Sequence, residues 1–162
     1  MKYRFVNILF CFGLLLNGAL MSYGQSPSDL ADEYYKKDEF DKAANEYARV
    51  LKNQVSWPVA FRYVNSLMRV NKTDEAEKYL KRQTRSENEN THLFEILSGF
   101  LAGKKPDSLE VSNHFKAALK NAQKSTARAE QAAVAFNDIS EPKWAISALL
   151  LARETSREPG SY

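Results

Sequence analysis

The sequence has few of the residues that crosslink, bend or interrupt a chain. Its 162 residues include one cysteine, six glycines and five prolines. Alanine, leucine, glutamate and lysine are frequent, and no stretch alternates apolar and polar residues for long enough to form a half-buried strand. The composition therefore predicts an all-helical chain and gives no support to a β-sheet.

A basic head, a short apolar core and a small-residue end predict that residues 1–24 are a secretory signal peptide. Lys2 and Arg4 form the head, and the apolar core spans residues 8–16. A membrane-spanning helix needs roughly 20 apolar residues, whereas a signal core has about 7 to 15. The short core disfavours the alternative of a retained anchor. We expect cleavage after Gly24, export to the periplasm or cell envelope, and no stable membrane insertion afterwards.

The expected mature chain, residues 25–162, lacks cysteine and has almost no net charge. Cys11 is the only cysteine of the sequence and lies within the signal. The mature chain therefore has no disulfide and no thiol for catalysis or metal binding. Without Lys2 and Arg4 it carries 21 basic and 20 acidic residues. Nucleic acid is not an expected partner, because that function usually requires a concentrated basic face.

The sequence also lacks the motifs of catalysis and cofactor binding. His92 and His114 are the only histidines, and neither has partners at the spacing of metal ligands. No glycine-rich phosphate loop, nucleophile elbow or dinucleotide fingerprint is present. The acidic residues stand three or four positions from lysines, as on a solvated helix face. The sequence therefore predicts no enzyme activity, no metal and no cofactor.

What the sequence does contain is a pair of amphipathic segments that meet at a polar corner near Asp38. Large, small and aromatic residues follow one another along the pair in the order Leu30, Ala31, Tyr34, Ala43, Tyr47 and Val50. The order resembles that of a tetratricopeptide repeat, a helical hairpin of about 34 residues. A small residue such as Ala43 lets two helices approach closely, and aromatic rings fill the space beside that contact.

The position of Ala43 recurs at Ala76, Val111 and Ala145, in steps of 33, 35 and 34 residues. The resemblance implies an all-α fold, a right-handed superhelical stack of antiparallel helix pairs. About four tetratricopeptide-like units are expected, at about 27–56, 57–90, 91–124 and 125–157, with 158–162 as the start of a further repeat or a truncated end. The third unit is expected to hold one extra residue between its helices, around Lys105 to Ser108. An irregular bundle of about eight helices is the alternative.

The resemblance implies two sets of residues, one that packs the repeats together and one that lines a binding groove. Those expected to pack the repeats are Ala31, Tyr34, Ala43, Tyr47, Ala76, Phe115, Phe136 and Ala145. The first helix of each unit is expected to line a concave groove that receives a peptide or a helix. The groove positions are Ser28, Asp32, Tyr35, Lys36, Phe61, Asn65, Met68, Arg69, Glu95, Gly99, Ala102, Glu130, Val134 and Asn137.

Aromatic, methionine and arginine side chains commonly anchor interfaces. The residues expected to contact a partner are Tyr35, Phe61, Arg62, Asn65, Met68 and Arg69. The aromatic residues among them are equally suited to pack between neighbouring repeats. Both interpretations stay open at this point.

The signal and the repeat together predict a protein-binding scaffold of the bacterial cell envelope. The style of the signal and the start at Gln25 resemble those of exported Bacteroidetes proteins. One alternative is the amino-terminal recognition part of a longer envelope enzyme or sensor. Another is a repeat-based outer-membrane glycan-binding protein, although such proteins generally carry a lipidated cysteine where this chain has Gln25. The last helix, residues 143 to about 155, is apolar around much of its circumference, which predicts self-association through it.

Overall fold

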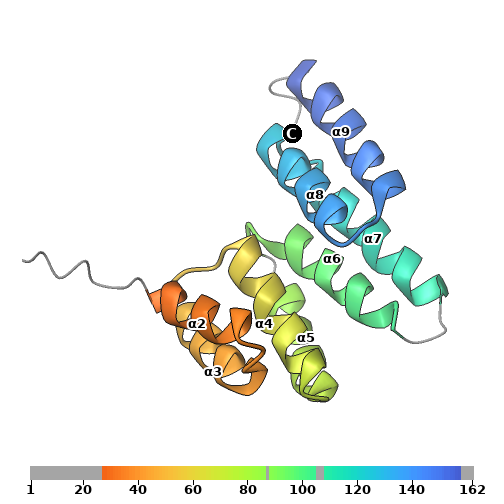
Figure 1. The fold of residues 1–162 in the computed structure, drawn as a ribbon. Helices are drawn as coiled ribbons and strands as arrows, with labels where there is room; N and C mark the ends of the chain where they lie inside the picture. The colour runs from red at the N-terminus through yellow and green to blue at the C-terminus, as the bar shows by residue number, and fades with distance from the viewer. Residues whose placement is uncertain (1–26, 87, 105–107, 158–162) are drawn as a thin grey trace, which may run out of the picture.

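The computed structural model describes residues 27–86, 88–104 and 108–157, and all regular structure in these ranges is α-helical (Figure 1). The helices are α2 (Pro27–Lys36), α3 (Phe40–Val50), α4 (Trp57–Arg69), α5 (Thr73–Arg85), α6 (Thr91–Ala102), α7 (Ser108–Ala122), α8 (Thr126–Asp138) and α9 (Pro142–Arg157). The all-helical class is therefore confirmed for these residues. The predicted signal peptide, its cleavage site and segment 158–162 lie outside the described residues.

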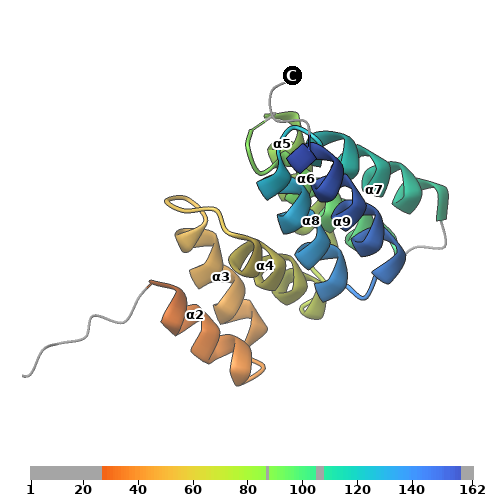
Figure 2. The same cartoon turned by 90° about the horizontal axis from the view of Figure 1, so that it is seen from above.

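The helices pack mainly against their neighbours in the chain. The most extensive contacts join α8 to α9, α6 to α7 and α2 to α3, and further contacts join α3 to α4 and α5 to α6. Both views place the α2–α3 pair at one end of the molecule and the α8–α9 pair at the other (Figures 1 and 2). The first helices of successive pairs also touch, α2 on α4, α4 on α6 and α6 on α8.

Three of the helix pairs are joined by the same type of corner. Each corner holds a residue of positive φ, Asp38 at 59°, Asn71 at 58° and Ser140 at 64°. The residue after it donates its backbone N–H to the carbonyl five positions earlier, over 2.8 to 3.0 Å. This hydrogen bond closes a helix in a Schellman motif. Each corner residue stands five positions before Ala43, Ala76 or Ala145, so the corner recurs with the sequence period.

Replacing Ser140 with glycine should stabilise the protein by roughly 0.5 to 1 kcal/mol, because a side chain is strained in the left-handed region and glycine is not. Ser147 is exposed inside α9, and glycine there should instead cost about 1 kcal/mol. Thermal unfolding followed by circular dichroism compares the two variants. Shifts of the same sign would contradict the assigned corner.

Helix α6 is shared by two hydrophobic cores. Phe94, Leu97 and Leu101 belong to the core built with α2 to α5, whereas Leu93 and Ile96 belong to the core built with α7 to α9. Nine of the 12 residues of α6 are buried, as expected for a helix that is apolar on most sides. This single helix therefore joins the two halves of the chain.

The position of α6 corrects one expectation about the third pair. Gly99 is buried against Phe115 of α7, so that a Cβ on Gly99 would lie 2.3 Å from the ring. Its counterparts in the other pairs are the buried Ala31, Val64 and Ala133. These four residues are separated by 33, 35 and 34 positions, the same steps as those of the Ala43 series.

The expectation of an extra residue between the helices of the third pair is therefore wrong. The extra residue lies before α6, in the polar segment that follows α5. The expectation that Gly99 and Ala102 line the groove is wrong for the same reason, since both are buried. A glycine inside a helix marks a close approach of another element, here the Phe115 ring.

Candidate functional site

The predicted groove begins with an ion pair between the first helices of the first two pairs. Asp32 of α2 accepts a hydrogen bond from the Tyr47 hydroxyl at 2.6 Å and pairs with the Arg62 guanidinium of α4 at 2.6 Å. Burial alone would raise the pKa of Asp32, but the hydrogen bonds from Tyr47 and Arg62 outweigh it and lower that pKa. The Asp32 carboxylate therefore stays charged and holds α2, α3 and α4 together.

Tyr35 adds a second link between α2 and α4. Its hydroxyl donates to Asn65 Oδ1 at 3.3 Å, and the Arg62 guanidinium lies 6.0 Å from the centre of its ring. The side chains of Tyr35, Arg62 and Asn65 are all half-buried. Three of the six predicted partner contacts, Tyr35, Arg62 and Asn65, are thus brought into one network that already joins the first two pairs.

Two other predicted contacts lie nearer the end of α4. The guanidinium of Arg69 lies 4.8 Å from the centre of the Phe40 ring, at the start of α3. Met68 is half-buried and packs against the first core. Arg69 is exposed, so its charged group remains accessible while its position is fixed by the aromatic ring.

The sixth predicted contact, Phe61, belongs to a different cluster. Its ring stacks on Trp57 at 5.6 Å and meets Phe100 of α6 at 5.6 Å, and Lys104 lies 5.2 Å from the centre of the Phe100 ring. The Trp57 indole N–H donates to Asp138 Oδ2, at the end of α8, over 2.8 Å. We call Trp57, Phe61 and Phe100 the aromatic strip. It brings α4, α6 and α8 to one surface, with a cation and an anion at its border.

Sequence reasoning missed most of this strip. Trp57, Phe100, Lys104 and Asp138 were not among the predicted contacts. A signal for Phe100 was present: once Gly99 is aligned with Ala31, the residue that follows it occupies the place of Asp32. No sequence signal indicated that Trp57 would reach α8, because the two residues of that hydrogen bond are 81 positions apart.

The residues predicted to pack the repeats lie in the interior with one exception. The buried ones are Ala31, Ala43, Tyr47, Ala76, Phe115, Phe136 and Ala145. Tyr34 is half-buried, and the ammonium of Lys42 lies 5.3 Å from the centre of its ring.

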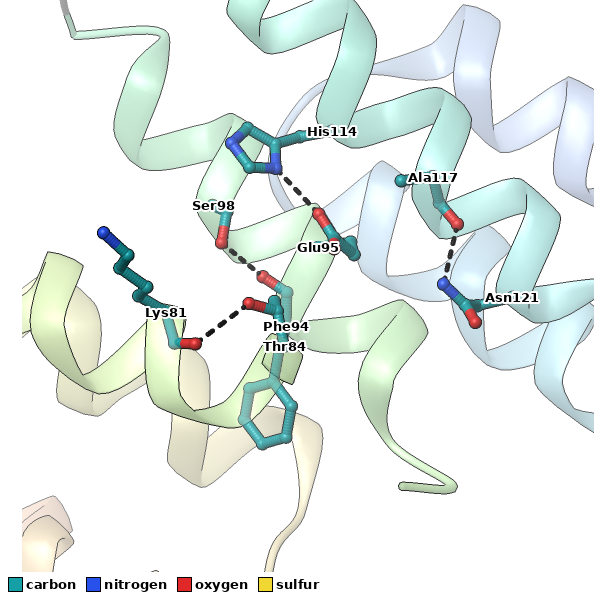
Figure 3. Close-up of polar contacts among 8 residues, drawn as sticks. All are labelled: Lys81, Thr84, Phe94, Glu95, Ser98, His114, Ala117 and Asn121. Atoms are coloured by element: carbon teal, nitrogen blue, oxygen red, sulfur yellow. Dashed lines mark hydrogen bonds and ion pairs between the residues drawn. The ribbon is translucent and has the colours of Figure 1, made fainter. Parts of the chain in front are cut away.

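A furrow of about 340 Å³ lies between α5 and α7, with α6 as its floor (Figure 3). The residues that line it are Glu77, Leu80, Lys81 and Thr84 of α5, Ser98, Leu101 and Ala102 of α6, and Glu110 and His114 of α7. Beside it, His114 Nδ1 bonds Glu95 Oε2 at 2.7 Å, and this bond raises the pKa of His114 against the opposing effect of burial. Glu95 thus faces α7 and not the predicted groove.

The Ser98 and Thr84 hydroxyls, which line the furrow together with His114, both donate to backbone carbonyls. The Ser98 hydroxyl donates to the Phe94 carbonyl at 2.9 Å, and the Thr84 hydroxyl donates to the Lys81 carbonyl at 3.3 Å (Figure 3). A hydroxyl nucleophile would instead have to donate to the imidazole. The geometry therefore makes the His114–Glu95 pair an ionic link between α6 and α7.

The other histidine, His92, is buried at 1 % exposure between α6 and α8. Its Nε2 lies 3.2 Å from Gln131 Oε1, and its Nδ1 has no hydrogen-bond partner. Burial is the main cause that lowers the pKa of His92 to about 4, and the charge of Arg128 adds to it. The imidazole is therefore neutral at physiological pH.

This buried histidine should make the protein sensitive to mild acid. The unfolded chain gains a proton at His92 near pH 6.5, whereas the folded chain gains it only near pH 4. The contribution of His92 to stability should therefore fall as the pH drops through this window, by about 2 kcal/mol between pH 7 and pH 5, whereas the raised pKa of His114 acts in the opposite direction. Urea unfolding at both pH values measures the loss. His92→Leu should remove this part of the loss, and an unchanged pH dependence in that variant would refute its origin in His92.

Neither a metal site nor a membrane span emerges from the part of the chain that the structure describes. Within it, no three His, Cys, Asp or Glu side chains gather closely enough to hold an ion. None of the described helices is long and apolar enough to cross a membrane. No family model and no curated protein matches the chain.

Proposed function

We propose that this chain is an exported scaffold of the tetratricopeptide type that binds a partner protein through the aromatic strip. The observation that carries the proposal is the strip itself. Three half-buried aromatic side chains from α4 and α6 lie at one surface, bordered by Lys104 and Asp138. Large aromatic rings that are incompletely covered are the usual anchors of a protein interface.

The repeat architecture is supported by two recurring features. A small or compact residue is buried at the corresponding position in the first helix of each pair, at Ala31, Val64, Gly99 and Ala133. The left-handed corner recurs in three pairs with the same spacing. An irregular bundle has no reason to repeat both features at the same steps, so we favour a stack of repeats with a right-handed superhelical course.

The border of the strip suggests the chemistry of the partner. Lys104 is exposed and offers a cation beside the Phe100 ring. An extended peptide or a helix with an apolar anchor and an acidic neighbour fits this surface. In contrast, Tyr35, Arg62 and Asn65 already bind one another, so they support the surface and contribute less to binding.

Recovery of a partner from envelope extract tests the proposal. Immobilised wild-type protein should retain a partner that Phe61→Glu loses, and Lys104→Glu should reduce its recovery roughly tenfold, as for one important interface residue. Lys120→Glu is the matched control, because it makes the same charge change on an exposed position of α7. Circular dichroism checks that each variant is folded. Equal recovery by all four proteins, or no retained protein, would refute the proposal.

Export is the second part of the proposal and rests on residues 1–24. Mass spectrometry of the protein from the envelope fraction should find an amino terminus at Gln25. A terminus at Met1 in that fraction would refute the cleavage.

A further inference from the structure

The described residues leave an apolar surface exposed at the α8–α9 end. Val134, Ile146, Leu149 and Leu150 are 46 to 59 % exposed, and they are four of the five large exposed hydrophobic residues in the described ranges. We call these four residues the α9 face. It is separate from the aromatic strip, to which none of the four belongs.

The earlier pairs show what covers this surface elsewhere in the fold. Leu149 stands four positions after Ala145, and its counterparts by the same spacing are Tyr47, Leu80 and Phe115. All three counterparts are at most 2 % exposed. The second helix of each earlier pair packs against the first helix of the next one, as α3 does against α4. Leu149 therefore lies at a position that is buried in all three earlier pairs, whereas the counterparts of Leu150 in the second and third pairs, Lys81 and Lys116, are exposed.

The charges around the α9 face differ from those of the interface between the first and second pairs. Where the first pair meets the second, Asp32 binds Arg62 and Asp41 binds Lys72, each at 2.6 Å. The counterparts of Asp32 and Asp41 in the last pair are Val134 and Lys143. A helix that docks there should thus present an apolar residue to Val134 and an acid to Lys143, the reverse of what α4 and α5 present.

A second copy stacked end to end meets these requirements poorly. Its leading helix would be α2, where Asp29 replaces Arg62 and Glu33 replaces the fully buried Ser66. Glu33 is paired with Lys37 at 2.6 Å on the surface. Stacking would bury this ion pair against Leu149 and its neighbours, and burial of charges without new partners is costly.

We propose that the α9 face binds an amphipathic helical hairpin of another protein, with its first helix seated as α4 is seated on α3. Its first helix places an apolar residue against Val134, and the corner that follows places an acid beside Lys143. The apolar face supplies the affinity, and the Lys143 pair selects the partner. This binding is independent of the aromatic strip.

A designed probe tests this geometry with the full chain. The probe is a fluorescent synthetic peptide that copies residues 56–86, with Arg62→Leu and with either Glu or Lys at position 72. The Glu probe should bind wild-type protein at least tenfold more tightly than it binds Leu149→Glu, by fluorescence anisotropy. Lys143→Glu should reverse the order of the two probes, so that the Lys probe binds more tightly. Lys104→Glu, which alters the aromatic strip, should bind both probes as the wild type does.

Three results would overturn the inference. They are the absence of binding by either probe, affinity that survives Leu149→Glu, and a preference that Lys143→Glu does not reverse. Light scattering of the chain without a probe tests whether a second copy binds instead. A dimer that Leu149→Glu dissociates would assign the α9 face to self-association. Circular dichroism of Leu149→Glu should match the wild type, because Leu149 is 55 % exposed.

Discussion

Gly99→Ala should destabilise the protein by roughly 2 kcal/mol, although alanine is the better helix former. The added methyl group would lie 2.3 and 2.6 Å from two carbons of the Phe115 ring. That ring cannot move aside, because it is 1 % exposed and contacts Phe136 and Trp144 edge to face at 5.1 and 5.4 Å. Thermal unfolding should show a melting temperature lower by about 6 °C.

Gly103→Ala is the control for this prediction. Gly103 ends α6 with φ −62°, and the nearest atoms to an added Cβ are 3.5 Å away. Alanine fits there and should leave stability unchanged or raise it by about 0.5 kcal/mol. Similar losses in the two variants would mean that α6 does not approach α7 most closely at Gly99.

Phe94→Ala should have the larger effect, a loss of roughly 3 to 5 kcal/mol. Phe94 is fully buried and packs edge to face on Tyr79 at 6.0 Å, in the first core. Because α6 also forms part of the second core, a loss of packing around α6 should also destabilise α7 to α9, although Phe94 is not part of that core. Urea unfolding should remain a single transition with a lower midpoint. Hydrogen exchange should accelerate in both halves of the chain.

Phe100→Ala is the matched control on the same helix. Phe100 is half-buried in the aromatic strip, so its loss should cost about 1 to 2 kcal/mol. Faster exchange confined to α2 to α5 in Phe94→Ala would show that the two cores unfold independently and that α6 does not couple them.

Local patterns predicted the helices well and the surface of the molecule less well. The helical class and the polar corners follow from residues that are near one another in the sequence. Asn71 and Asp38 combine turn-forming chemistry with tolerance of positive φ, so their corners could be placed without a structure. The role of Ser140 is harder to see, because serine is less common in that conformation.

The error in α6 has a physical cause. Leu97 and Leu101 offer the large apolar side chains expected of a first helix, and they are indeed buried. They face the first core, however, whereas Gly99 faces α7. In a helix that is apolar on most sides, the large residues do not indicate which side faces the paired helix. The close approach that fixes the rotation is marked by the smallest one.

The aromatic strip was unpredictable for a different reason. Its members lie on α4 and α6, and the indole of Trp57 is held by Asp138 of α8. Their meeting depends on how successive pairs are turned relative to one another. Spacing along the chain gives the order of the pairs, but it does not give that turn. Phe61 could be predicted as a contact because its position within the first helix of its pair was enough to identify it. Trp57 and Phe100 could not be predicted in this way.

The shared position of α6 also restricts how such a chain can change by recombination. A recombination junction in the loop 51–56 or at 123–125 would separate whole helix pairs. It would leave α6 joined to both α5 and α7. A junction at 86–90 would part α6 from α5 and open the first core along Phe94, Leu97 and Leu101. Units are therefore exchanged most easily at the ends of this array, and its centre is inherited as one block.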